Sequence, residues 1–135
     1  MLNDNSYIAN YATLKITVSL DNNTKLGKLG IIIIDKEDNL KNFKPYRDGV
    51  HQIYLSSTSY SWVYYGLPKG NYAIGAAQDL NNNRKLDYEI EKYAFSRDVQ
   101  AVNGNINSFD SCKTDIKESF CQIIIHCDRF ALHNL

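Results

Sequence analysis

The sequence lacks an excess of charge of either sign, because 15 Lys and Arg residues balance 15 Asp and Glu residues. A surface that binds nucleic acid or anionic lipid usually carries a basic excess, so we expect neither partner. No apolar run approaches the roughly 20 residues that a membrane-spanning helix needs. With 44% hydrophobic and 22% charged residues, the composition is that of a globular domain.

The opening segment Met1–Ser6 lacks the basic start and the apolar stretch of a signal peptide. We therefore expect either a protein that stays inside the cell or a chain that begins after a removed export signal. A length of 135 residues predicts one domain. Its expected parts are a flexible segment at residues 1–10, a single domain at 11–128 and a tail at 129–135.

Cysteine is scarce, and its number is odd, at three. In a strand, Cys121 and Cys127 would lie about 20 Å apart, whereas a disulfide needs Cα atoms within about 7 Å. Any bridge should therefore join Cys112 to Cys121 or to Cys127, and a hairpin through Lys117 and Glu118 makes Cys121 the easier partner. The alternative is three small buried apolar side chains.

A sustained apolar period of 3.6 residues is also missing, so no helix is predicted. Residues Leu14 to Val18 instead alternate with polar neighbours, and Ile31–Ile34 is a β-branched run typical of a strand buried on both faces. Residues 35–49 are predicted to be a long connection. The expected strands are centred on residues 14–18, 31–34, 53–55, 60–64, 72–76, 109–116 and 120–127. About seven short strands separated by turn residues predict an all-β, antiparallel β-sandwich.

A turn, a strand and an oxygen-rich loop follow one another between Gly66 and Asp87. The loop has the ligand offsets of an EF-hand-type calcium site, which are filled by the side chains of Asp79, Asn81, Asn83 and Asp87 and the carbonyl of Lys85. Arg84 occupies the sixth position, where such loops favour glycine, and it opposes a bound cation. The alternative is a loop of Asx turns that binds no metal. Calcium is the one cofactor that the sequence suggests.

The segments Leu67–Ala73, Asp79–Asp87, Tyr93–Ser96 and Phe109–Cys112 occur in an order that resembles the bacterial exported family known as domain of unknown function 2141. That family has a Leu-Pro-x-Gly-x-Tyr-Ala turn and strand, an Asp-x-Asn-x-Asn-Gly-x-Leu-Asp loop, and later Tyr-Gly-Phe-Ser and Phe-x-x-Ala segments. The resemblance covers about residues 14 to 126. It implies a transthyretin-like or immunoglobulin-like β-sandwich and a periplasmic or secreted location, and it implies no established activity.

Three alternating aromatic residues, Tyr60, Trp62 and Tyr64, offer either a platform for a sugar or protein partner or, as we favour, the core face of a strand. The three histidines show no zinc-ligand spacing, and no nucleophile motif surrounds a Ser or Cys residue. We therefore expect a noncatalytic envelope or secreted binding module for a protein or glycan partner, either monomeric or weakly self-associated. The alternatives are a small metal-dependent hydrolase and a structural domain that self-associates through a strand edge.

Overall fold

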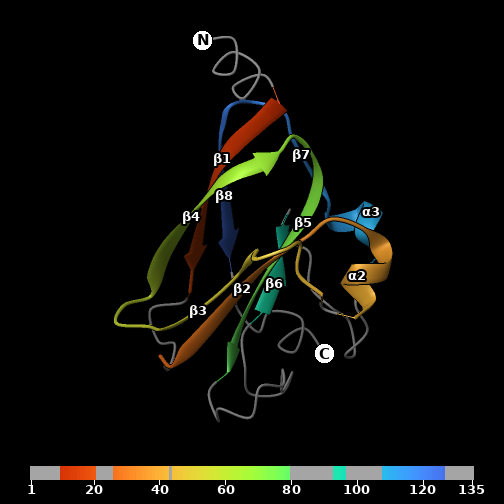
Figure 1. Cartoon of the computed structure of the whole chain (residues 1–135). Coiled ribbons are helices and arrows are strands. Elements are labelled where there is room, and N and C mark those ends of the chain that lie inside the picture. Colours follow the sequence, from red (N-terminus) through yellow and green to blue (C-terminus); the bar gives the residue numbers. More distant parts are fainter. Residues whose placement is uncertain (1–9, 21–25, 43, 80–92, 97–107, 127–135) are drawn as a thin grey trace.

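The computed structural model describes residues 10–20, 26–42, 44–79, 93–96 and 108–126 (Figure 1). Strands dominate this part of the chain, and two short helices lie on one side of it. In chain order the elements are β1 (Tyr11–Ser19), β2 (Lys28–Ile34), α2 (Glu37–Lys41), β3 (Val50–Tyr54), β4 (Ser59–Pro68), β5 (Gly70–Asp79), β6 (Tyr93–Phe95), α3 (Phe109–Cys112), β7 (Thr114–Ile116) and β8 (Phe120–His126).

The strands form two sheets that pack face to face as a β-sandwich, which confirms the predicted fold class. A three-stranded sheet has the order β4-β1-β8, and a five-stranded sheet has the order β3-β2-β5-β6, with β7 paired to β5. One pairing departs from a wholly antiparallel sandwich, because β1 and β8 run parallel, with Thr13 opposite Phe120. Sheet-forming residues therefore come from nearly the whole described chain.

The main core lies between the two sheets, where the alternating side chains of each strand meet. In β1 the inward residues Leu14, Ile16 and Val18 are completely buried, while Lys15 and Thr17 are only half-buried on the outer face. The inward residues of β2, Leu29, Ile31 and Ile33, meet them from the other sheet. A period of two with one covered face thus accounts for the position of β1.

A second, smaller core covers the outer face of the five-stranded sheet. Ile34 and Ala73 contribute from the sheet, Leu40 from α2, Phe95 from β6 and Cys112 from α3. Because β2 is covered on both faces, its run of four isoleucines needs no polar side, as the sequence predicts. The two helices were not predicted; α2 lies within the expected connection at 35–49, and α3 replaces the first half of the strand expected at 109–116.

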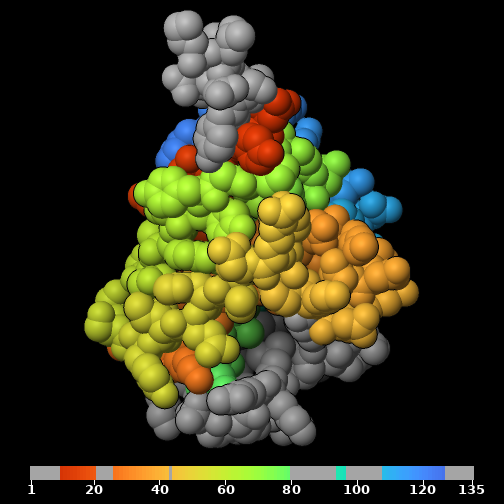
Figure 2. Space-filling model, viewed as in Figure 1, coloured from red at the N-terminus to blue at the C-terminus, as the bar shows by residue number. Residues whose placement is uncertain are grey.

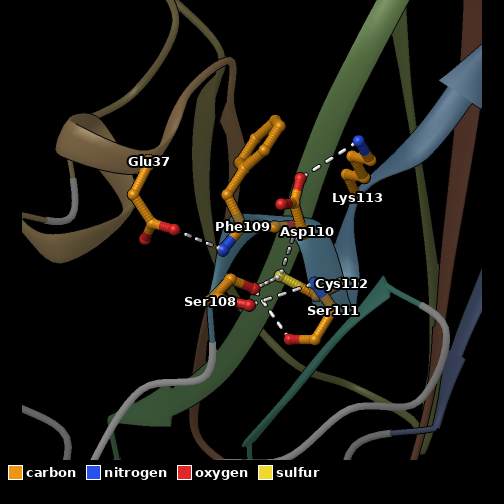
Figure 3. Close-up of polar contacts among 7 residues, drawn as sticks. All are labelled: Glu37, Ser108, Phe109, Asp110, Ser111, Cys112 and Lys113. Carbon is orange, nitrogen blue, oxygen red and sulfur yellow. Dashed lines mark hydrogen bonds and ion pairs between the residues drawn. The ribbon is translucent and has the colours of Figure 1, made fainter.

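The helices are joined to each other and to their own turns by polar contacts (Figure 3). Glu37 of α2 accepts a hydrogen bond from the backbone N–H of Phe109, at 3.0 Å. Ser108 caps the start of α3 by accepting from the N–H of Ser111 at 3.3 Å, and Asp110 pairs with Lys113 at 3.1 Å. These contacts hold the motif segment Phe109–Cys112 over the second core, where Cys112 is buried and Phe109 is packed.

Candidate functional site

Strand β3 is an edge strand of the five-stranded sheet, and β4 is an edge strand of the three-stranded sheet. On this side of the sandwich lies a row of aromatic rings, here called the aromatic edge, made of His51, Tyr60, Trp62 and Tyr64. Three of these residues alternate along β4 and point inward, opposite Val18, Ile16 and Leu14 of β1. They are half-buried and pack against the main core. Figure 2 shows β3 and β4, in yellow to lime, running together across this face.

His51 of β3 joins the row from the other sheet. Its ring lies nearly parallel to those of Tyr60 and Trp62, with interplanar angles of 10° and 12° and centroid distances of 5.6 and 5.2 Å. Its Nε2 atom is 2.7 Å from the hydroxyl oxygen of Tyr60. The ring of Tyr64 meets that of Trp62 edge to face, at 5.8 Å. Offset stacking and edge contacts are the favourable geometries for such rings, so the row also ties the two sheets together.

The row ends at a turn formed by residues 46–49. Arg47 has a φ of 49°, a left-handed conformation that is uncommon for a residue other than glycine. The turn is held to β2, because Tyr46 N–H donates to the Ile33 carbonyl and Ile33 N–H donates to the Gly49 carbonyl, both at 2.7 Å. A Cβ atom on Gly49 would lie 2.7 Å from the Tyr46 carbonyl oxygen, so this position needs glycine.

The turn places two opposite charges beside the aromatic edge. The guanidinium of Arg47 lies over the Tyr46 ring, 5.5 Å from its centroid. The Tyr64 hydroxyl donates to Asp48 Oδ1 at 2.6 Å. Burial, and then the hydrogen bond to Asp48, raises the pKa of Tyr64 to about 12. Its phenol therefore stays protonated and keeps donating to the carboxylate at any physiological pH.

A bulge follows the third ring of β4. Between Ala12 and Leu14 the partner residues shift from Leu67 to Tyr64, so β4 holds one residue more than β1. Gly66, with a φ of 73°, provides the left-handed position that this kind of bulge requires. Tyr65 faces outward by the alternation of the strand and is 73% exposed, while the extra residue returns Leu67 to the core.

The three predicted aromatic side chains of β4 therefore pack against the main core but are only half-buried. Sequence reasoning missed the role of His51, which was considered only as a zinc ligand. It also missed the turn at 46–49, which lay within the predicted long connection. The turn did carry a detectable signal, since Pro45, Asp48 and Gly49 are typical turn residues. What the sequence did not show is that the connection returns to lie beside the rings.

The predicted calcium loop cannot be assembled from the described residues. Asp79 is half-buried at the end of β5, opposite Lys28 of β2. The other four candidate ligands, Asn81, Asn83, Lys85 and Asp87, lie outside the described residues. Within the described ranges, no three His, Cys, Asp or Glu side chains gather as a metal site would require.

Of the pairings left open by the sequence, the bridge from Cys112 to Cys121 is not formed, because Cys121 is a free thiol. The two residues belong to different layers. Cys112 is buried in the second core, outside the five-stranded sheet, whereas Cys121 faces the main core from β8. The alternative of a small apolar side chain holds for Cys112, and Cys127 lies outside the described residues.

A buried serine explains the Tyr-Ala-Phe-Ser segment. The Ser96 hydroxyl accepts from Ile74 N–H at 3.0 Å and donates to the Cys112 carbonyl at 2.5 Å, so it joins β5 to α3. Phe95 lies against Gly75 of β5, where a Cβ atom would be 2.9 Å from the Phe95 ring. These residues shape the second core and lie far from the aromatic edge in the sheet order.

Comparisons with known proteins give a family and one solved structure. A search of curated proteins finds no significant match. A pilus-presented adhesin, Spy0125 (Cpa), in a cysteine-to-alanine mutant, is 14% identical with a TM-score of 0.40, over 89% of this chain. The present chain spans only 28% of that adhesin. In the described residues, no helix combines the length and the hydrophobicity needed to cross a membrane.

The family comparison covers most of the chain. The family described as uncharacterized protein conserved in bacteria (DUF2141) matches residues 16–123. This range includes residues from every strand of both sheets, the whole aromatic edge and the two helices of the second core. The ordered motifs and the matched range together lead to one conclusion: this chain belongs to the DUF2141 family.

Proposed function

We propose that the protein is a noncatalytic binding module of the cell envelope or the secreted fraction, and that its aromatic edge binds a glycan. The observation that carries the proposal is the row of four half-buried rings with Arg47 and Asp48 at one end. A sugar ring presents apolar C–H faces and polar hydroxyl groups together. A recognition surface for it needs both aromatic carbon and charged hydrogen-bonding groups.

The roles of the groups follow from their chemistry. The guanidinium of Arg47 only donates hydrogen bonds, and the carboxylate of Asp48 only accepts them. Asp48 has a free acceptor capacity beyond the single bond from Tyr64, because an ionised carboxylate has about four lone-pair positions. Together they can bind hydroxyl groups of either orientation next to the ring of Tyr64.

The test uses the only tryptophan of the chain, Trp62, as a built-in reporter. A glycan array selects the ligands, and the fluorescence of Trp62 then follows their titration. The key variant is Arg47→Gly, which removes the guanidinium and suits the left-handed backbone, so it should fold at least as well as the native protein. Lys113→Ala, at an exposed ion pair on the second core, removes a positive charge elsewhere and is the matched control.

We expect Arg47→Gly to weaken glycan binding at least about tenfold, corresponding to one or two charge-assisted hydrogen bonds. Lys113→Ala should bind as the native protein does. Equal affinities for native protein and Arg47→Gly, or a binding ligand that leaves the Trp62 fluorescence unchanged, would contradict the proposed site.

A further inference from the structure

Strand β8 ends the three-stranded sheet, and one of its two edges has no strand beside it among the described residues. It pairs with β1 along its whole length, from Phe120 to His126. The strand contains no charged residue and no Pro, two of the usual means of protecting a sheet edge. An edge of this kind is ready to accept a further strand.

The hydrogen bonding of β1 shows which groups β8 offers at that edge. Thr13 N–H donates to the Ser119 carbonyl at 2.8 Å, while Thr13 lies opposite Phe120. In a parallel pair, every second residue of a strand directs both its N–H and its carbonyl group to the partner strand, and the residues between direct theirs to the opposite edge. Ser119, Cys121 and Ile123 therefore face β1, and Phe120, Gln122 and Ile124 direct their N–H and carbonyl groups to the open edge.

The same three residues also point their side chains to the outer face of the sheet. Phe120 is 58% exposed and Ile124 is 52% exposed, with Gln122 between them. A backbone edge with no neighbouring strand in the described ranges thus coincides with two large exposed apolar side chains. Either a second copy of this chain or a strand of another protein has the chemistry to cover both.

We infer that the occupant is a second copy of this chain, with β8 pairing antiparallel to the partner's β8 about a two-fold axis at Gln122. This register places Phe120 opposite the partner's Ile124, and Gln122 opposite the partner's Gln122. Aromatic and β-branched residues form favourable cross-strand pairs, and two glutamine amides can donate to and accept from each other. The edge is therefore complementary to itself, as a two-fold interface requires.

Electrostatics allows this assembly. Strand β8 has no Asp, Glu, Lys or Arg residue, so no like charges meet within the paired strands. The whole chain has a formal net charge of +0 at pH 7. Two copies consequently approach without net repulsion. The product is a continuous sheet with the order β4-β1-β8 and its symmetry mate, and it leaves the aromatic edge, at β4, at the far ends. The inference is thus independent of the proposed glycan site.

Sedimentation velocity over a range of protein concentrations tests the inference. The variants place a charged residue at position 122, where the two-fold axis passes. Gln122→Lys sets two positive charges directly opposite each other, and Gln122→Glu sets two negative charges. We expect the native chain to dimerise reversibly and each variant alone to dimerise about tenfold more weakly. An equimolar mixture of the two variants should restore the dimer, because opposite charges then meet at the axis.

The matched control is Gln52→Lys, an exposed glutamine on the edge strand β3 of the other sheet, which should dimerise as the native chain does. Hydrogen exchange gives an independent readout. The amides of Phe120, Gln122 and Ile124 should become protected only as concentration rises, whereas that of Cys121 is protected throughout by β1. A native chain that stays monomeric at millimolar concentration, or a Gln122→Lys variant that dimerises normally, would overturn the inference.

Discussion

Replacing Gly75 with alanine tests how the second core is packed. A Cβ atom at this position would lie 2.9 Å from Cε1 and 3.1 Å from Cδ1 of Phe95, and 3.2 Å from Cγ2 of Ile32. Phe95 is 5% exposed and cannot swing outward without opening the core. Such overpacking costs about 1–3 kcal/mol, and the removal of a strand glycine returns about 0.5–1 kcal/mol. The difference spans about 0–2.5 kcal/mol, and the close approach to a ring that cannot move places this variant in the upper part, at about 1–2 kcal/mol lost from the free energy of unfolding.

The matched control is Gly30→Ala, in the middle of β2. Its nearest contact would be the Ala77 carbonyl oxygen at 3.8 Å, an ordinary van der Waals distance, so this variant should be neutral or slightly more stable. Urea denaturation followed by circular dichroism measures both. With an m value of about 2 kcal/mol/M, Gly75→Ala should lower the midpoint by about 0.5–1 M. If both alanine variants had the same midpoint, the described contact between β5 and Phe95 would be refuted.

Three further predictions concern a buried serine, two tyrosines and the predicted calcium loop. Ser96→Ala removes the acceptor of the buried Ile74 N–H, so it should lower the free energy of unfolding by about 1–3 kcal/mol in the same urea assay, and an unchanged midpoint would contradict the link. Burial raises the pKa of Tyr64 and of Tyr72 to about 12, so ultraviolet titration should show these two phenols ionising after ordinary tyrosines. Because the folded state favours the protonated phenols, their stabilisation is complete below pH 10 and is lost as pH rises toward 12; simultaneous ionisation of all tyrosines in the folded protein would refute it. Calcium should raise the melting temperature relative to chelator if the loop from Asp79 to Asp87 holds the ion, whereas Asx turns predict no shift.

The sequence predicted most of the sandwich because its strands carry simple patterns. The alternation of Leu14, Ile16 and Val18 and the four consecutive isoleucines of β2 each leave few alternatives for which side is buried. The helices escaped prediction because each is a single turn or little more, too short for an apolar period to repeat. Their stability comes from tertiary contacts such as that between Glu37 and Phe109, which no local pattern records.

The aromatic edge was predicted only in part for a related reason. The period of two in β4 identified Tyr60, Trp62 and Tyr64 as sharing a face, but it could not decide how far that face is covered. Coverage depends on β3, which belongs to the other sheet and brings His51 into the row. The left-handed Arg47 has no sequence signal, because most such positions are occupied by glycine or asparagine.

The parallel pairing of β1 with β8 has a consequence for how the molecule forms. Thr13 and Phe120 are far apart in the sequence. Their pairing therefore closes a very long loop, and the entropy of closure is lost before any contact energy is gained. During synthesis, the backbone edge of β1 that pairs with β8 stays open until this late strand has left the ribosome. Folding should therefore be slow for a domain of this size and governed by the arrival of β8. Until then that open edge of β1 is available to chaperones or to premature aggregation.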